Sequence, residues 1–357
     1  MRNIIWLSID SLSDIHVTPE TMPTLCDLLE LRFCNHVACT PYTSASWYNQ
    51  ITGKYAQDIG YDRFSLAGCN DIFFHKGYHL QSNVIQLFKE AGYQTVLDSF
   101  YADWMDWLPG FAQSNKIKSS VFPQRPKCSP FLWVFHYVGL HHDTTDKNRV
   151  NLKRELYPAV LKKHDKIIGR WVDAVYQSGD ILVITSDHGV TWVPGLDEHH
   201  GATLYESSIR TLFGIKGIDW QWNVTALSRN IDVAPTLLAL ALEQKMDCEG
   251  VDLIKIYNNE AIELDYAILE TGSAWETPDF HSRFGVRWVY HKYVFDWTSE
   301  QVLALTKPIL HPEYIAQDGT PNRSNSYLRA GREILGSYLA SHGLERQYDK
   351  LQDVIAK

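Results

Sequence analysis

An aspartate–histidine pair lies in the segment "ITSDHGV", directly after a short apolar run. Asp187 supplies a carboxylate oxygen and His188 an imidazole nitrogen, and both groups are ordinary ligands of a divalent metal ion. Gly189 allows the backbone to turn sharply and to approach a bound group closely. A second carboxylate, Asp10, follows the apolar run "NIIWLSI". Together these side chains form a candidate metal site, although an aspartate that only caps a strand or helix end gives the same local pattern.

A hydroxyl group in the segment "CTPYTSASWYNQITG" is a candidate nucleophile. Residues 44–52 are predicted to form a short helix with Thr43 as its N-cap. A hydroxyl at this position lies at the positive end of the helix dipole, beside free N–H groups that also bind phosphate or sulfate. A metal ion bound to the hydroxyl would favour its deprotonated form. The simpler alternative is that Thr43 only caps the helix.

Histidine doublets follow two of the apolar runs, in a chain with 15 histidines. The segment "GLHHDTTD" contains His141 and His142, and "DEHHGATLYESSIR" contains His200 beside a glycine. A histidine with a pKa near 6.5 can protonate a leaving group or hydrogen-bond a phosphoryl oxygen. Exposed histidines in loops often have no such role, so neither doublet identifies a site by itself.

The elements that must position these residues alternate between apolar runs and amphipathic stretches. Strands are predicted at residues 4–9, 94–97, 131–138, 180–185 and 212–215, and helices at residues 22–31, 82–91, 156–176 and 233–242. Strands that are apolar throughout indicate a mostly parallel sheet with both faces covered by helices. Ligands of such sheets bind where strands end at the carboxyl edge. Asp10 and Asp187 are both expected at this edge.

The pattern changes after about residue 265. Residues 284–295 alternate in the way typical of hairpin strands, and residues 326–339 are predicted to form a closing helix. We therefore predict an α/β catalytic domain over residues 1–265, with a mostly parallel central sheet sandwiched by helices. A small α+β subdomain is expected over residues 266–357.

Composition and charge exclude several classes of protein. The chain has 357 residues and a formal net charge of −9, which argues against a broad nucleic-acid-binding surface. No apolar run approaches the roughly 20 residues of a membrane span. The first apolar run is too short for a signal peptide and ends at Asp10, so a cytoplasmic location is expected. The six cysteines form no CxxC pair and are expected to be reduced. The sequence gives no indication of the oligomeric state.

Several segments, taken in order, resemble the sulfatase-like branch of the alkaline phosphatase superfamily. They are "NIIWLSIDSL", "TSASWYNQITGKYAQDIG", "NVIQLFKEAGYQT", "YPAVLKKHDKIIGRWVDAV", "ILVITSDHG" and "NIDVAPTLLALA". The resemblance covers most of residues 3–255. It implies the fold of that superfamily, a divalent metal ion, and a small anionic ester as substrate.

The resemblance also decides between two candidate nucleophiles. Cys39 begins "CTPYT", a near match to the C-x-P-x-R motif whose cysteine sulfatases oxidise to formylglycine, but it lacks the arginine. In sulfatases the modified residue lies nine positions before the threonine of a Thr-Gly pair. Thr43 lies nine positions before Thr52, whereas Cys39 lies thirteen before it. We therefore expect no formylglycine and identify Thr43 with the nucleophile, as in members that act on phosphate esters.

The metal ligands follow from the same resemblance. Asp10, Asp187 and His188 match the family's ligands, with the hydroxyl of Thr43 as a further one. Sulfatases usually carry two adjacent aspartates at the first position, whereas Ser11 follows Asp10 here. This difference favours Mn²⁺ or Zn²⁺, with Ca²⁺ and Mg²⁺ as alternatives.

Substrate contacts are implied at four further positions. His141 matches the histidine that binds substrate or protonates the leaving group, and His142 is a competing register for it. His200 matches a histidine that contacts the transferring group, or binds a second metal ion in two-metal members. Trp47 stands where the family has an arginine and is expected to line the leaving-group pocket.

The resulting hypothesis is a metal-dependent hydrolase or transferase of phosphate esters, acting on a phosphodiester or a phosphoglycerol-type group. Thr43 would form a covalent phospho-threonine intermediate, and His141 would protonate the leaving oxygen. The first alternative is a sulfatase-type hydrolase of sulfuric esters. The second is a catalytically silent, metal-binding protein that keeps the fold, which the loss of the arginine at Trp47 favours.

Overall fold

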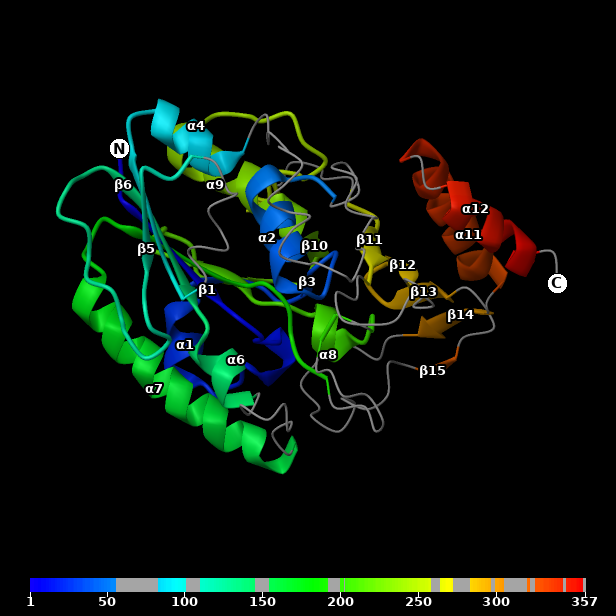
Figure 1. Ribbon diagram of the computed structural model, residues 1–357, viewed down its shortest axis with the longest axis horizontal. Helices are drawn as coiled ribbons and strands as arrows, with labels where there is room; N and C mark the ends of the chain where they lie inside the picture. Colours follow the sequence, from blue (N-terminus) through cyan, green and yellow to red (C-terminus); the bar gives the residue numbers. More distant parts are fainter. Residues whose placement is uncertain are drawn as a thin grey trace.

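A twisted central sheet carries the strands that the apolar runs predict (Figure 1). The computed structural model describes residues 1–55, 83–100, 110–144, 154–191, 200–201, 203–257, 264–271, 283–296, 299–304, 320–321, 325–342 and 345–355. Within them the strand order is β5-β4-β6-β1-β7-β8-β2-β9. The bounds are β1 (Ile4–Ile9), β2 (Leu31–Phe33), β4 (Gln94–Ser99), β5 (Gln113–Lys116), β6 (Phe131–Tyr137), β7 (Ile181–Ser186), β8 (Phe213–Lys216) and β9 (Trp222–Val224).

The register of the central strands brings the candidate ligands to one edge of the sheet. β1 is parallel to β6 on one side and to β7 on the other. Ile9 lies opposite Tyr137 of β6 and Ser186 of β7. Asp10 and Asp187 are the next residues along their strands, so both leave the sheet at the same carboxyl edge. The sheet is mostly parallel because only β8 runs against its neighbours, β7 and β2, among the described pairings.

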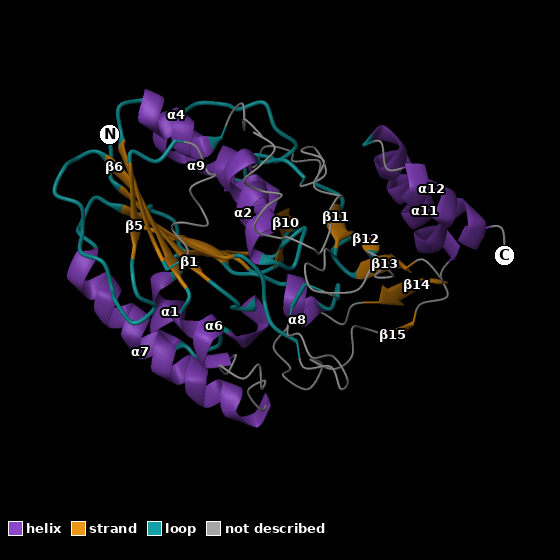
Figure 2. Cartoon of the chain, in the orientation of Figure 1, coloured by secondary structure: helices purple, strands orange, loops and turns teal. Residues whose placement is uncertain are grey.

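Helices cover both faces of the central sheet (Figure 2). One face carries α1 (Pro23–Leu28), α6 (Gly139–Thr144) and α7 (Tyr157–Val175), and the other carries α2 (Thr43–Thr52), α4 (Val84–Glu90) and α9 (Val233–Leu242). Residues of β1 alternate between the two cores that result. Ile4 and Trp6 pack in the core under α2, α4 and α9, whereas Ile5 and Leu7 pack in the core under α1 and α7. Burial of each isoleucine or leucine among these side chains contributes about 1.5–3 kcal/mol.

A second, antiparallel sheet lies beside the first. Its described strands are β11 (Ala267–Glu270), β12 (Phe284–Arg287), β13 (His291–Asp296), β14 (Ser299–Ala304) and β15 (Thr320–Pro321). The helices α11 (Asn325–Ser341) and α12 (Glu345–Ile355) pack against each other, and α11 contacts strands of this sheet. Residues of this region share an apolar core with Cys39 and Ile231 of the first region. The α/β fold class expected from the sequence, with a small α+β part at the C-terminus, is thus confirmed.

Short elements complete the described chain. They are β3 (His36–Val37) and β10 (Ser228–Arg229), which pair with each other, and η1 (Asp14–His16), η4 (Arg154–Leu156), α8 (Glu206–Ile209), η5 (Asn230–Asp232) and α10 (Ile254–Tyr257). Across the residues described, none of the helices has the length and apolar character needed to cross a membrane.

Two local predictions differ from the structure. The helix expected over residues 22–31 ends at Leu28, because Leu31 and Phe33 alternate inward as part of β2. The helical spacing of the leucines is correct only for Leu25 and Leu28, which are buried in α1. Thr43 is the first residue of α2, and the N-cap position belongs to Tyr42.

Candidate metal centre and active site

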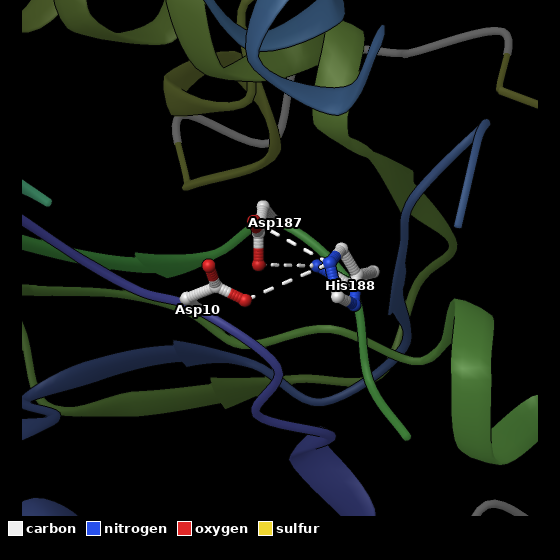
Figure 3. A group of neighbouring side chains, drawn as sticks. All are labelled: Asp10, Asp187 and His188. Carbon is white, nitrogen blue, oxygen red and sulfur yellow. Dashed lines mark hydrogen bonds and ion pairs between the residues drawn. The ribbon is translucent and has the colours of Figure 1, made fainter. Parts of the chain in front are cut away.

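Asp10, Asp187 and His188 converge at the carboxyl edge of the central sheet (Figure 3). One ligand atom from each lies within 4.8 Å of those of the other two, and all three residues are buried. The Nε2 atom of His188 lies 3.7 Å from Oδ1 of Asp10 and 3.6 Å from Oδ2 of Asp187. Two ligand atoms of a tetrahedral metal ion with bonds of about 2.1 Å are roughly 3.4 Å apart. The spacing therefore fits one divalent ion held between the three side chains.

The electrostatics of this cluster also favour a cation. Burial raises the pKa of Asp10 well above its usual value, and repulsion from the Asp187 carboxylate raises it further. The ion pairs of the two carboxylates in the described part of the chain involve histidines, with no lysine or arginine. Two buried like charges are costly unless a positive charge compensates them. A divalent ion would supply that charge, so the donor set fits the metal that the fold implies.

Ser11 holds both carboxylates in place. Its hydroxyl donates to Oδ1 of Asp10 at 2.8 Å, and its backbone N–H donates to Oδ1 of Asp187 at 3.1 Å. Its φ of 66° lies in the left-handed region, which is rare for a residue other than glycine. Such a conformation costs about 1–3 kcal/mol and persists where the surroundings impose it. The backbone at Ser11 is thus adapted to orienting the two acids.

The orientation of His188 leaves Nε2 directed at the metal position. Its Nδ1 lies 3.0 Å from the carbonyl oxygen of Gly189, so Nδ1 carries the hydrogen in this bond. The Nε2 lone pair of the neutral ring is then available to a metal ion. A Cβ atom on Gly189 would lie 2.0 Å from the carbonyl oxygen of Ser207. The glycine is therefore needed for a close approach of the backbone, here to another part of the chain.

Thr43 lies beside the candidate metal ligands. Its Oγ1 is 3.2 Å from Nε2 of His188. The first turn of α2 is tied to the end of β7, because Oγ of Ser46 donates to the carbonyl oxygen of Asp187 at 2.6 Å. Asn230 donates in turn to Oγ of Ser46 at 3.0 Å. This buried network places the hydroxyl of Thr43 within reach of an ion bound by the three ligands.

Two more of the predicted histidines reach this site. The Nδ1 atom of His141 lies 3.0 Å from Oγ of Ser11 and 3.5 Å from Oδ1 of Asp10. The ring of His200 stacks on His188, with 4.1 Å between ring centroids, and lies 5.6 Å from the ring of His141. Burial and the neighbouring His188 lower the pKa of His141 to about 4. The side chain of His141 is 22% exposed, so a ligand from solvent can contact it.

The other two predicted contacts lie elsewhere. His142 packs edge-on against Phe100, and burial lowers its pKa. Of the two histidines in the doublet, His141 is the one that lies beside Asp10. Trp47 is 1% exposed and packs against the rings of Trp6 and His136. From the sequence, Trp47 is expected to line the leaving-group pocket. It lies instead on the face of α2 that packs on the sheet, so its side chain belongs to the core.

His136 is a site residue that the sequence reasoning missed. It lies on β6 within a run of aromatic and aliphatic residues, and its Nε2 is 3.6 Å from Oδ2 of Asp10 and 3.9 Å from Oδ2 of Asp187. Burial lowers its pKa to about 4. The available signal was an ionisable residue inside an otherwise apolar strand.

Cys39 is separate from this chemistry. The residue is 1% exposed and packs with Ile231 and Phe284 in the core of the second sheet. Burial raises the pKa of its thiol, so the reactive thiolate is disfavoured. None of the five cysteines in the described residues forms a disulfide, and Cys69 lies outside those residues.

Comparison with known proteins places this geometry in a known fold. The sulfatase family model matches residues 2–117. A 2-O GAG sulfatase aligns with 97% of this chain and 93% of its own, at 16% identity and a TM-score of 0.70. A phosphonate monoester hydrolase from Silicibacter pomeroyi aligns with 96% of this chain and 95% of its own, at 14% identity and a TM-score of 0.66.

A third structure, a protein in the alkaline phosphatase superfamily from Vibrio parahaemolyticus, aligns with 88% of this chain and 83% of its own. Its identity is 17% and its TM-score 0.58. No curated protein sequence matches the chain. The chain has the α/β fold of the alkaline phosphatase superfamily, which confirms the fold that the resemblance implies. More particularly, its N-terminal part, which contains Asp10 and Thr43, matches the sulfatase family.

Proposed function

We propose that the protein is a metal-dependent hydrolase or transferase of phosphate esters, with Thr43 as its nucleophile. The observation that carries the proposal is the position of Oγ1 of Thr43, 3.2 Å from the Nε2 atom of His188 in the cluster with Asp10 and Asp187. A divalent ion held there would offset charge on the phosphoryl oxygens and lower the pKa of the Thr43 hydroxyl. Mn²⁺ or Zn²⁺ suits a donor set with an imidazole nitrogen, and Ca²⁺ and Mg²⁺ are the alternatives.

The first half of the reaction transfers the phosphoryl group to the protein. Oγ1 of Thr43 loses its proton to solvent and attacks phosphorus in line, which forms a phospho-threonine and breaks the bond to the leaving oxygen. Free N–H groups at the start of α2 are suited to bind the phosphoryl oxygens. His141 protonates the leaving oxygen. The anionic ester favours the protonated ring because a nearby negative charge raises the pKa of a histidine.

The second half releases the phosphoryl group. Water or an acceptor hydroxyl attacks the phosphorus of the phospho-threonine, and its proton passes to the neutral His141. The bond to Thr43 breaks, and Oγ1 of Thr43 takes a proton back from solvent. Water as the attacking group gives hydrolysis, whereas an acceptor alcohol gives transfer. We assign the contact with the transferring group to His200, and its stacking on His188 supports this role.

Phosphate is favoured over sulfate because the nucleophile position holds an unmodified threonine. Cys39, the residue that begins the near match to the formylglycine motif, is buried with a raised thiol pKa. A sulfuric ester hydrolase is the second candidate, and the match of residues 2–117 to the sulfatase family model favours it. A silent metal-binding protein is the third.

A panel of esters with matched variants tests the proposal. The purified protein, supplied with Mn²⁺ or Zn²⁺, is assayed on a nitrophenyl phosphate monoester, the corresponding diester and a nitrophenyl sulfate. Thr43→Ala is expected to reduce turnover of the phosphate ester by at least about 10³-fold, since removal of a nucleophile eliminates the covalent route. Cys39→Ala is the matched control and should retain the activity of the unmodified protein.

Each contrary result selects another reading. Full turnover by Thr43→Ala would refute the nucleophile assignment. Faster cleavage of the sulfate than of either phosphate ester would establish the sulfuric ester hydrolase instead. Metal binding without turnover of any ester would favour the silent protein.

A further inference from the structure

His136 faces the second oxygen of each metal-binding carboxylate. It lies in β6, directly beside β1, and its side chain is fully buried. Its Nε2 atom is 3.6 Å from Oδ2 of Asp10 and 3.9 Å from Oδ2 of Asp187. The imidazole therefore meets both acids from within the sheet.

The other oxygen of each acid has different partners. Oδ1 of Asp10 faces Ser11, His141 and His188. Oδ1 of Asp187 accepts the backbone N–H groups of Ser11 and His188. These contacts fix one oxygen of each carboxylate. His136 faces the other oxygen, Oδ2, of each carboxylate. A carboxylate presents a defined ligand geometry only when both of its oxygens are held in place.

Two neighbours fix the ring of His136. Its Nδ1 lies 3.2 Å from Oγ of Ser99, and the ring of Trp47 packs against it edge-on with 5.4 Å between centroids. When the Ser99 hydroxyl donates to Nδ1, the hydrogen of the neutral ring is on Nε2 and points toward the two acids. A closing movement of about 0.5 Å brings Nε2 to hydrogen-bond distance of a carboxylate oxygen.

We propose that His136 is a positioning residue that orients the carboxylates of Asp10 and Asp187 for metal binding, with Ser99 selecting its tautomer. The inference rests on the metal site of the proposed function. Hydrogen bonds to ligating carboxylates from groups behind them commonly change metal affinity by about 10–100-fold. Trp47 then has a role in the core, where it holds the plane of the His136 ring.

Metal affinity of the full chain, measured without substrate, tests this inference. Isothermal titration with Mn²⁺ and competition with a chromophoric zinc chelator give the dissociation constants of the metal-free protein and its variants. His136→Leu is expected to weaken binding by about 10–100-fold. His136→Gln keeps an N–H donor and should lose less. Ser99→Ala should fall between the unmodified protein and His136→Leu, because it removes only the tautomer selection.

His36 provides a matched control. It is also a buried imidazole whose Nδ1 lies beside a serine hydroxyl, at 3.1 Å from Oγ of Ser228, and burial lowers its pKa to about 3. His36→Leu should lower thermal stability much as His136→Leu does, yet leave metal affinity unchanged. Equal losses of affinity in both variants would overturn a specific role for His136.

Other outcomes are separable. Unchanged affinity in His136→Leu, or equal losses in His136→Leu and His136→Gln, would overturn the orienting hydrogen bond. If His136→Leu does not fold, unchanged affinity in Ser99→Ala has the same consequence. If the unmodified protein binds neither metal ion, the metal site of the proposed function fails first, and the role of His136 fails with it.

Discussion

Asp10 and Asp187 at the edge of the parallel sheet contrast with the half-buried Glu206 of α8 in how the charge of an acid is compensated. Burial raises the pKa of Asp10, and Asp187 adds repulsion. Burial also disfavours the Glu206 carboxylate, but the cations Arg287 and Lys292 outweigh it and bring the pKa of Glu206 to about 2. Both cations are almost completely buried, at 2.9 Å and 3.3 Å from the glutamate oxygens.

The difference separates a structural centre from a functional one. Around Glu206 the chain supplies its own positive charges, so the cluster is complete when the protein folds. Around Asp10 the ion pairs of the described residues involve only histidines, and a bound cation would supply the compensating charge. The first centre joins α8 to the second sheet, whereas the second retains an electrostatic strain that a bound metal ion would relieve.

The largest expected effect comes from removing a charge at the functional centre. Asp187→Asn should reduce ester turnover by at least about 10³-fold, since the contribution of a metal ion to the transition state is several kcal/mol. The amide oxygen can still accept the N–H groups of Ser11 and His188, and repulsion with Asp10 is removed. The metal-free variant should therefore unfold at a urea concentration equal to or above that of the metal-free unmodified protein. A clearly less stable variant would contradict the strain assigned to this centre.

Removing the charge at the structural centre should have the opposite consequence for stability. Glu206→Gln removes the carboxylate that pairs with the buried Arg287 and Lys292, which should lower the free energy of unfolding by about 3 kcal/mol. Urea denaturation followed by circular dichroism measures the change. Glu20→Gln is the control, because Glu20 is exposed and its replacement should have little effect. If both glutamines cost the same, the ion pairs around Glu206 do not stabilise the fold.

The pH dependence of stability gives the smallest and most discriminating effect. The pKa of Glu206 is lowered in the folded protein, so its contribution is complete above the unfolded value of about 4.3 and is lost as the pH falls toward about 2. The pKa of Asp10 is raised, so its proton favours the metal-free folded state at low pH, and that benefit is lost as the pH rises above about 3.9.

Unfolding of the metal-free protein between pH 6 and pH 3 measures both signs. The stability difference between the unmodified protein and Glu206→Gln should shrink as the solution becomes acidic. Asp10→Asn should be more stable than the unmodified protein near pH 6, because it lacks the buried charge. The unmodified protein should gain stability relative to Asp10→Asn as the solution becomes acidic, whereas it loses stability relative to Glu206→Gln. Parallel curves for the two variants would remove the distinction between the centres.

The sequence allows the main features of the site to be predicted, because local patterns determine them. Buried parallel strands are apolar throughout, so residues 4–9 and 180–185 identify β1 and β7 with errors of about one residue at their ends. Polar residues that directly follow such strands must lie at the carboxyl edge. Asp10 and Asp187 therefore share this edge, and they meet because β1 and β7 are neighbours in the sheet, which the local patterns do not determine.

Features that depend on distant pairing could not be predicted in this way. The side of the sheet that His136 faces depends on the register of β6 against β1, which joins residues more than a hundred positions apart. The direction of Trp47 depends on which face of α2 packs on the sheet. The charges around Glu206 come from the second sheet, 81 residues or more along the chain. An alternating pattern predicts the hairpin that carries these charges, but it does not predict that the hairpin contacts α8.

The link between Glu206 and the second sheet bears on how far the chain can be shortened. Lys292 also donates to the carbonyl oxygen of Leu204, so β13 holds the segment that connects α8 to His200. A truncation that ends before residue 267 would leave this segment without its anchor and expose the apolar surface around Cys39. The antiparallel sheet is therefore not a removable appendage. Deleting it is expected to disturb the candidate active site from a distance, even though all three candidate metal ligands would remain in the shortened chain.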